Sequence, residues 1–232
     1  IAVMGYGTIG SGVVDVLRIN KEKITKRAGE PVDVKYILDL REFPGDPMED
    51  AIVHDYQTIV NDPEIGIVVE TMGGVEPAYT FVKAMLEAGK QVATSNKNLV
   101  AAKGAELIKI ARDHNVNFQF EASVGGGIPI IRPMHQCLTA NNILKIAGIL
   151  NGTTNYILDQ MIRKGKTFET ALKDAQNNGF AERNPAADIE GADACRKICI
   201  LASLAFGKHV YPEQVHTQGI TKITLEDVAY AA

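Results

Sequence analysis

The sequence contains only three cysteines, Cys137, Cys195 and Cys199, among 232 residues. The number is odd and no two of them form a C-x-x-C pair, so the sequence encodes neither a disulfide framework nor a zinc knuckle. Cys195 and Cys199 are four positions apart and can share one helix face, where thiols without a histidine partner usually fill the core. This cysteine content predicts a protein of the reducing cytoplasm.

Long apolar runs and basic clusters are also missing. The longest nearly apolar run, residues 198–206, is about half of the roughly 20 residues that a membrane-spanning helix needs. Lys and Arg number 24 against 28 Asp and Glu, and no stretch concentrates basic residues densely enough to follow a phosphate backbone. Neither a membrane nor a nucleic acid is therefore expected as a partner.

The five histidines are scattered, at positions 54, 114, 135, 209 and 216. No two of them have H-x-x-x-H spacing, and none adjoins a cluster of acids that could bind a transition metal. All five are expected to be structural or solvated.

The first half of the sequence alternates short apolar β-type runs with longer helical patterns. Apolar residues recur at helical spacing from Ile9 to Leu17 and from Phe81 to Leu86. Strands are predicted between the helical patterns, at residues 1–5, 32–38, 65–69, 91–94 and 117–120. The alternation predicts an α/β fold with a doubly wound parallel sheet covered by helices on both faces.

The pattern changes at the glycine run 125–127, so we predict two domains, residues 1–124 and 125–232. In the second we expect a helix to about Thr139, a strand over 143–149, and helices over 153–164, 167–178 and 188–206. A single strand needs partner strands from elsewhere, which predicts an α+β substrate-binding and dimerisation domain. Because Ile1 already continues a strand pattern and a helix signal at Thr224 precedes the last residues, we expect a longer protein.

The first predicted strand runs directly into the motif Gly5-Tyr6-Gly7-Thr8-Ile9-Gly10, which opens a helix. The first glycine permits a tight turn, the second lets the backbone approach a pyrophosphate, and the third lets helix and strand pack closely. The unpaired N–H groups of the helix N-terminus favour the anion. The motif predicts a Rossmann-type dinucleotide site.

Asp39 and Arg41 follow the second predicted strand. An acid there would bind the ribose hydroxyls of NAD, and a nearby arginine would accept the extra phosphate of NADP. Both types are present, so the cofactor preference stays open. Asp39 lies 29 positions after Gly10 instead of about 20, and the charged extension 20–30 accounts for the difference.

Two further segments, Glu70 to Gly74 and Thr94 to Lys97, end predicted strands at the edge where open α/β sheets bind ligands. Lys97 could polarise a carbonyl there, although a lysine at a strand end is more often solvated. Asp193 and Lys197 are four positions apart, which on a helix puts them on one face. They form either a surface ion pair worth about 0.3–0.5 kcal/mol or a carboxylate that holds a functional ammonium.

Several motifs together resemble the homoserine dehydrogenase family. They are GYGTIGSGV at residues 5–13, ETMGG at 70–74, TSNKNLVA at 94–101, EASVGGGIPI at 121–130, LNGTTNYIL at 150–158 and DIEGADACRK at 188–197. The resemblance covers essentially the whole chain. It implies reduction of L-aspartate 4-semialdehyde to L-homoserine with NAD(P)H, in threonine, methionine and isoleucine biosynthesis, by a homodimer or larger homo-oligomer. Many members also carry a regulatory domain or an aspartate kinase.

The resemblance also implies roles for individual residues. Lys197 corresponds to the proton donor, and Glu182 and Asp193 correspond to substrate-binding acids, with Asp188 close by. The implied cofactor residues are the first glycine loop, Thr71, Ser95, Lys97 and Gly179. The implied site for a monovalent cation such as Na⁺ consists of Glu121, Val124, Gly126 and Ile128.

Two alternatives stay open at this point: another amino-acid-aldehyde dehydrogenase on the same cofactor fold, and a nucleotide-sensing module without turnover. Aspartate-semialdehyde dehydrogenase is disfavoured, because it needs a cysteine nucleophile paired with histidine. All three cysteines lie in segments that are predicted as helix.

Overall fold

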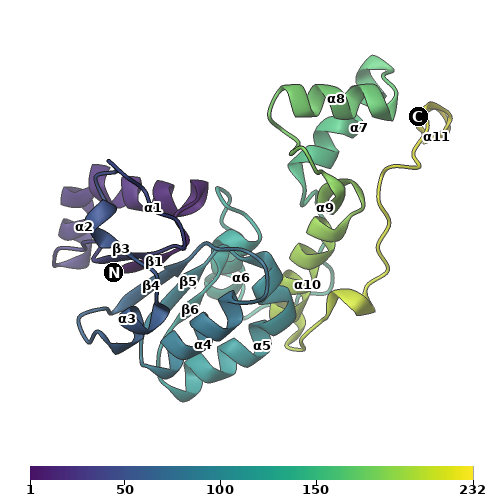
Figure 1. Ribbon diagram of the computed structural model, residues 1–232. Coiled ribbons are helices and arrows are strands. Elements are labelled where there is room, and N and C mark those ends of the chain that lie inside the picture. Colours follow the sequence, from purple (N-terminus) through teal and green to yellow (C-terminus); the bar gives the residue numbers. More distant parts are fainter. Residues whose placement is uncertain (232) are drawn as a thin grey trace. The chain divides into compact units, whose positions relative to one another are not determined.

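A computed structural model describes residues 1–231 of the chain. The chain divides into two compact units, Ile1–Gln136 and Cys137–Ala232 (Figure 1). The division lies later in the chain than residue 124, where the sequence changes pattern, and the two-domain boundary after that residue remains a prediction. None of the helices described is long and apolar enough to cross a membrane.

The first unit is built on a parallel sheet of six strands in the order β3-β2-β1-β4-β5-β6. The strands are short: β1 Ala2–Met4, β2 Tyr36–Leu38, β3 Ile52–Val53, β4 Ile67–Glu70, β5 Gln91–Thr94 and β6 Phe118–Gln119. The chain adds strands in one direction from β1 and then crosses to β4 on the other side, so the order reverses between these neighbours. This is the predicted doubly wound sheet, with its switch point between β1 and β4.

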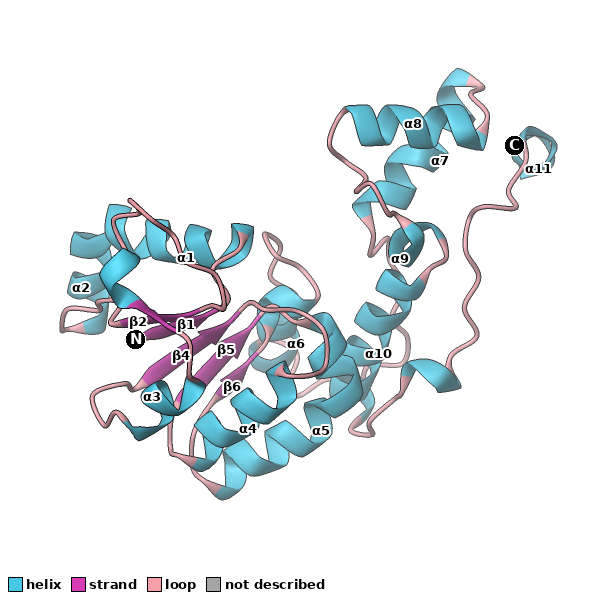
Figure 2. Ribbon diagram, in the orientation of Figure 1, coloured by secondary structure: helices cyan, strands magenta, loops and turns pink. Residues whose placement is uncertain are grey.

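Helices cover both faces of this sheet, because right-handed crossovers on the two sides of the switch point lead to opposite faces (Figure 2). The helices are α1 Thr8–Ile19, α2 Lys21–Ala28, α3 Tyr56–Asn61, α4 Ala78–Glu87, α5 Lys97–Asp113 and α6 Ile131–Gln136, with 3₁₀ turns η1 Glu49–Ala51 and η2 Glu121–Ser123. All three residues of β1 are buried, as expected for a strand covered on both faces. The edge strand β3 is not among the predicted strands, because its two residues carry too little pattern to be seen in the sequence.

The start of α1 lies unusually close to the turn that precedes it. Gly5 has φ +96°, a backbone conformation that favours glycine, and so ends β1 in a tight turn. Gly10 is buried, and a Cβ there would lie 1.8 Å from the carbonyl oxygen of Gly5. The third glycine of the motif therefore permits the close packing of helix on strand for which it is predicted.

The regular structure in the described part of the second unit consists of helices alone. Its helices are α7 Gly152–Lys164, α8 Phe168–Asn177, α9 Ala186–Ile189, α10 Ala192–Phe206 and α11 Leu225–Ala231, with the 3₁₀ turn η3 Pro212–Gln214. Ile157 and Met161 of α7 pack with Ala171 and Ala175 of α8 into a small core. This core fixes α7, whose N-terminus belongs to the site described below.

The predicted strand over residues 143–149 is wrong, because this segment has no regular structure. Leu144 and Ile149 are 90% and 76% exposed. The described part of the second unit contains no strand, so the backbone of this segment has no neighbouring strand to pair with. The helix expected to run to Thr139 also ends early, at Gln136, and Cys137 lies in a turn.

The single helix predicted over residues 188–206 is also wrong, because it is broken into α9 and α10. Gly191 has φ +86°, a left-handed conformation that separates the two helices and makes it the N-cap of α10. The later segment around Gly219 packs at this break: a Cβ on Gly219 would lie 2.3 Å from the carbonyl oxygen of Ile189, and Ile220 donates its N–H to that oxygen at 2.8 Å. A contact with residues thirty positions away along the chain cannot be inferred from local helix signals.

Gly10→Ala should destabilise the first unit, because the added Cβ would lie 1.8 Å from the Gly5 carbonyl oxygen. We expect the free energy of unfolding to fall by more than about 3 kcal/mol, the upper end of ordinary overpacking. The matched control is Gly12→Ala on the same helix, where a Cβ has nothing within 4 Å. It should gain about 0.5–1 kcal/mol. Chemical denaturation measures both, and equal stabilities would contradict the packing role of Gly10.

Candidate functional site

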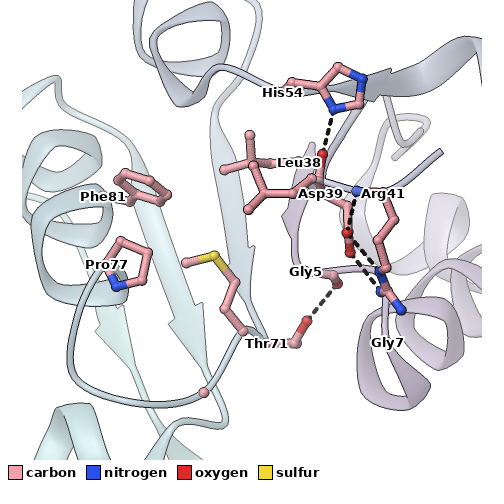
Figure 3. Close-up of a pocket in the computed structure, with 12 residues that line it drawn as sticks. Gly5, Gly7, Leu38, Asp39, Arg41, His54, Thr71, Pro77 and Phe81 are labelled. Atoms are coloured by element: carbon pink, nitrogen blue, oxygen red, sulfur yellow. Dashed lines mark hydrogen bonds and ion pairs between the residues drawn. The ribbon is translucent and has the colours of Figure 1, made fainter.

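The carboxyl ends of β1, β2 and β4 surround a cavity of about 510 Å³. This volume lies within the range of small-molecule and cofactor pockets. The lining residues are Gly5, Gly7, Leu38, Asp39, Leu40, Arg41, His54, Thr71, Met72, Gly73, Pro77 and Phe81 (Figure 3). Of the predicted cofactor residues, Gly5, Gly7, Asp39, Arg41 and Thr71 are therefore brought together at one cavity.

The rest of the glycine motif lies beside this cavity without lining it. The Tyr6 ring is buried and packs edge-on against Phe43, so the side chain of Tyr6 does not line the cavity. Thr8 and Ile9 are exposed at the start of α1, and Gly10 lies buried under them. Gly7 is the N-cap of α1 with φ −86°, and a Cβ there would meet nothing within 4 Å. Open space at the helix N-terminus is what a bound phosphate requires.

Asp39 and Arg41 form an ion pair at the edge of the cavity. Arg41 donates from Nε to Oδ1 at 3.0 Å and from Nη2 to Oδ2 at 2.9 Å, and the backbone N–H of Tyr6 donates to Oδ2 at 2.8 Å. The Arg41 guanidinium, with the backbone N–H groups of Tyr6 and Arg41, holds the pKa of the Asp39 carboxyl well below its usual range. Asp39 is thus an anionic acceptor, while the Arg41 side chain remains 61% exposed.

His54 also lines the cavity, although the sequence indicates only a structural or solvated histidine. It directly follows β3, the strand that the sequence pattern does not reveal. Its Nδ1 lies 2.7 Å from the carbonyl oxygen of Asp39, and its Nε2 lies 3.0 Å from a carboxylate oxygen of Glu42. The Asp39 carbonyl, together with Glu42, raises the pKa of His54.

A buried carboxylate joins the loops that follow β4 and β5. Glu70 is fully buried and accepts the N–H of Met72 at 2.8 Å, the Nδ2 of Asn96 at 3.3 Å and the hydroxyl of Thr94 at 2.5 Å. Thr71, the next residue, donates its hydroxyl to the carbonyl oxygen of Gly5 at 2.9 Å. Glu70 therefore fixes one wall of the cavity. The sequence marks its segment as a strand end but gives no signal for this role.

Ser95 lies in the loop between β5 and α5, and Lys97 begins α5. Neither residue lines this cavity. Ser95 donates its N–H to the carbonyl oxygen of Glu70 at 3.3 Å. Asn96 caps α5 by accepting the N–H of Leu99 at 3.1 Å. Lys97 is the first residue of the helix and is half-buried.

The predicted cation ligands, Glu121, Val124, Gly126 and Ile128, lie in and after η2. The Glu121 carboxylate accepts three backbone N–H groups at 2.6–2.8 Å, those of residues 130–132. Burial raises the pKa of Glu121, but these hydrogen bonds outweigh it, and the pKa is lowered. Residues 1–231 contain no cluster of three His, Cys, Asp or Glu side chains that could hold a metal. A cation here would depend on backbone oxygens, so this site stays a prediction.

In the second unit, Asp193 and Lys197 lie one turn apart on α10. Lys197 Nζ is 2.9 Å from Asp193 Oδ2 and donates to the carbonyl oxygen of Leu150 at 2.9 Å. The two side chains are only 16% and 3% exposed. A surface ion pair would be solvated, so this burial favours the interpretation in which a carboxylate holds a functional ammonium.

Asp188 joins the same cluster from α9. Asn151, which precedes α7, donates from Nδ2 to Asp188 at 2.7 Å and to Asp193 at 2.9 Å. Glu182 lies exposed in the loop between α8 and α9, where its carbonyl oxygen accepts from Gln176 at 3.2 Å. Gly179 starts that loop with φ +74°. The contacts described for Glu182 and Gly179 do not include the cluster.

Cys199 is poorly suited to act as a nucleophile. Burial raises the pKa of Cys199 to about 12, and the neighbouring Cys195 contributes less to this rise. Cys195 is also buried on α10, and Cys137 is exposed in its turn. A reactive cysteine needs a stabilised thiolate, which the surroundings of Cys199 oppose.

Comparison with known proteins gives consistent matches along the chain. Residues 5–121 match the family model "Homoserine dehydrogenase, NAD binding domain", and residues 129–232 match the model "Homoserine dehydrogenase". The homoserine dehydrogenase of Helicobacter pylori is 45% identical over 233 residues, which is 100% of this chain and 54% of that protein. The chain therefore spans about half the length of the curated relatives it matches.

Solved structures give the same result. A homoserine dehydrogenase from Thiobacillus denitrificans matches with a TM-score of 0.90 and 44% identity over 99% of this chain and 54% of its own. A hyperthermophilic archaeal homoserine dehydrogenase in complex with NADPH matches with a TM-score of 0.82 and 27% identity. That match covers 96% of this chain and 73% of the archaeal one.

Gly7→Val should abolish nucleotide binding and leave the fold intact. The backbone at Gly7 is extended and a Cβ there meets nothing within 4 Å, so valine fits the free protein. Its side chain would fill the space that a pyrophosphate needs. We expect the Kd for NADH and for NADPH to rise at least about 100-fold, or about 2.8 kcal/mol, with an unchanged melting temperature. Fluorescence titration tests this; wild-type affinity in the folded variant would remove the dinucleotide from this loop.

Proposed function

The chain belongs to the homoserine dehydrogenase family, and on this premise we propose that the protein interconverts L-homoserine and L-aspartate 4-semialdehyde with NAD(P). The observation that carries the proposal is the buried Asp193–Lys197 pair. An ammonium fixed by a carboxylate can donate a proton to an alkoxide as it forms, and its charge also stabilises that oxyanion.

The cavity in the first unit fits a dinucleotide. Gly5 and Gly7 would let the pyrophosphate approach the N-terminus of α1, and Asp39 or Arg41 would bind the adenosine ribose or its phosphate. We propose Thr71, Ser95, Lys97 and Gly179 as further contacts. When bound, the nicotinamide supplies or accepts the hydride.

The residues of the second unit would bind substrate and handle the proton. Lys197 would give its proton to the aldehyde oxygen during reduction and recover it during oxidation, while Asp193 keeps the ammonium in place. Glu182 and Asp188 are proposed to bind the ammonium group of the amino acid, for which a carboxylate is the natural partner. Lys97 is proposed as a second catalytic lysine that polarises the carbonyl.

The cofactor preference is left as NAD or NADP, because Asp39 favours the first and Arg41 the second. The archaeal relative in complex with NADPH supports the phosphorylated form as one ligand of the family. We further propose that the oxygens of Glu121, Val124, Gly126 and Ile128 bind Na⁺, since oxygen donors suit a hard cation. A homodimer or larger homo-oligomer in the cytoplasm completes the proposal, and the three free cysteines suit a reducing compartment.

A spectrophotometric assay of the full-length protein tests this function. Homoserine should drive formation of reduced nicotinamide with NAD, with NADP or with both. Tight binding of NAD(P)H without homoserine-dependent turnover would instead identify a nucleotide-sensing module, and turnover only with other hydroxy amino acids would identify a different dehydrogenase.

Lys197→Arg should lower kcat by about 10²–10⁴, the usual contribution of a positioned acid or base. Arginine keeps the charge and can still pair with Asp193, but its pKa is too high for proton exchange and its planar fork has a different shape. The matched control, Lys164→Arg at the exposed end of α7, should keep wild-type turnover. Near wild-type kcat in Lys197→Arg at saturating substrates would refute the proton-donor role and make Lys97 the next candidate.

A further inference from the structure

Asn151 occupies an unusual place among the groups of the second unit. It is 7% exposed and precedes α7, where its Oδ1 accepts the N–H of Thr154 at 2.8 Å and so caps the helix. Serine, aspartate and asparagine are about equally good at this task. Capping alone therefore does not explain why an amide stands here.

The other end of the Asn151 side chain contacts both acids of the cluster. Its Nδ2 donates one hydrogen to Asp188 Oδ1 at 2.7 Å and the other to Asp193 Oδ2 at 2.9 Å. An amide nitrogen has two N–H donors, so both are used. The amide thus lies between two carboxylates that would otherwise repel each other in a poorly solvated place.

The same Asp193 oxygen also receives Lys197. Oδ2 lies 2.9 Å from Lys197 Nζ, and Nζ donates in turn to the carbonyl oxygen of Leu150, the residue just before Asn151. The N-terminus of α7 therefore supplies a donor to Asp193 and an acceptor to Lys197. A shift of Asp193 away from Asn151 would move the ammonium with it.

We infer that Asn151 is a positioning residue for the reaction: its amide bridges Asp188 and Asp193 and thereby fixes the Lys197 ammonium. This inference rests on the proposed function. Asn151 acts through the carboxylates and is not itself assigned a contact with substrate or cofactor.

Two substitutions separate the bridge from the cap. Asn151→Ser and Asn151→Asp both keep an oxygen that can cap α7, and neither keeps an amide donor. Asn151→Ser should retain the melting temperature and lower kcat about 10- to 100-fold, with little change in KM for the nucleotide. The reference for a simple loss of capping is Thr167→Ala at the start of α8, which should lower the melting temperature and leave kcat unchanged.

Asn151→Asp places a third carboxylate beside Asp188 and Asp193. Neighbouring like charges raise carboxyl pKa values, so Asp193 would become protonated at a higher pH and release the ammonium. The acid limb of the pH profile of kcat should therefore move to higher pH by about one unit or more. Asn151→Ser adds no charge, so its slower turnover at an unchanged melting temperature, and not this shift alone, distinguishes the bridge from the cap.

Each outcome decides the inference. Wild-type kcat in Asn151→Ser together with an unshifted pH profile in Asn151→Asp would overturn it. A loss of turnover that only follows the melting temperature, as in Thr167→Ala, would overturn it as well. If the wild-type protein fails to oxidise homoserine although it binds NAD(P)H, the proposed function itself is rejected and the inference with it. Active wild type with slow, folded Asn151 variants supports both.

Discussion

The need to satisfy buried carboxylates governs both units of the protein. Glu70 is fully buried at the end of β4, and Asp193 is 2% exposed at the start of α10. An uncompensated charge in such a place costs several kcal/mol, so the donors that surround it must be held in position by the fold. The loops that supply those donors are consequently held by hydrogen bonds to the buried acids. The two loops around Glu70, together with the first residue of α5, contain Thr71, Ser95 and Lys97, three of the proposed cofactor residues.

The two units meet this need with the same arrangement. Asn96 caps α5 with its Oδ1 and donates from Nδ2 to Glu70, and Asn151 caps α7 with its Oδ1 and donates from Nδ2 to Asp193. In each case one side chain satisfies a free N–H of a helix N-terminus and a free oxygen of a buried acid. The helix start is thereby tied to a neighbouring element that does not adjoin it in sequence. Removal of either asparagine would therefore leave both an N–H of the helix N-terminus and an oxygen of the buried acid without this hydrogen bond.

Local sequence signals predict part of this architecture. The spacing of Gly5, Gly7 and Gly10 identifies the loop between β1 and α1. The requirements for these glycines, a tight turn, an approach for the pyrophosphate and close helix packing, all lie within six residues. The spacing of Asp193 and Lys197 likewise predicts their pairing on one turn of a helix. Burial, which makes this pair more than a surface contact, depends on the packing of α10 against other elements and cannot be obtained from spacing. His54 illustrates the same limit, since the two-residue strand before it leaves no pattern.

The error over residues 188–206 involves a contact that is distant along the chain. One helix is predicted through residues 188–206, yet Gly191 adopts φ +86° and the segment around Gly219 packs at this point, so the helix is divided. That division lets Asp188 and Asp193 contact Asn151 from two different helices. On one continuous helix, side chains five positions apart would point in different directions. Capping preferences are limited in a similar way. They predict that a polar residue starts α7, but they do not distinguish serine, aspartate and asparagine. The choice among the three is made by the two acids at the other end of the side chain, because asparagine alone of the three offers them two N–H donors.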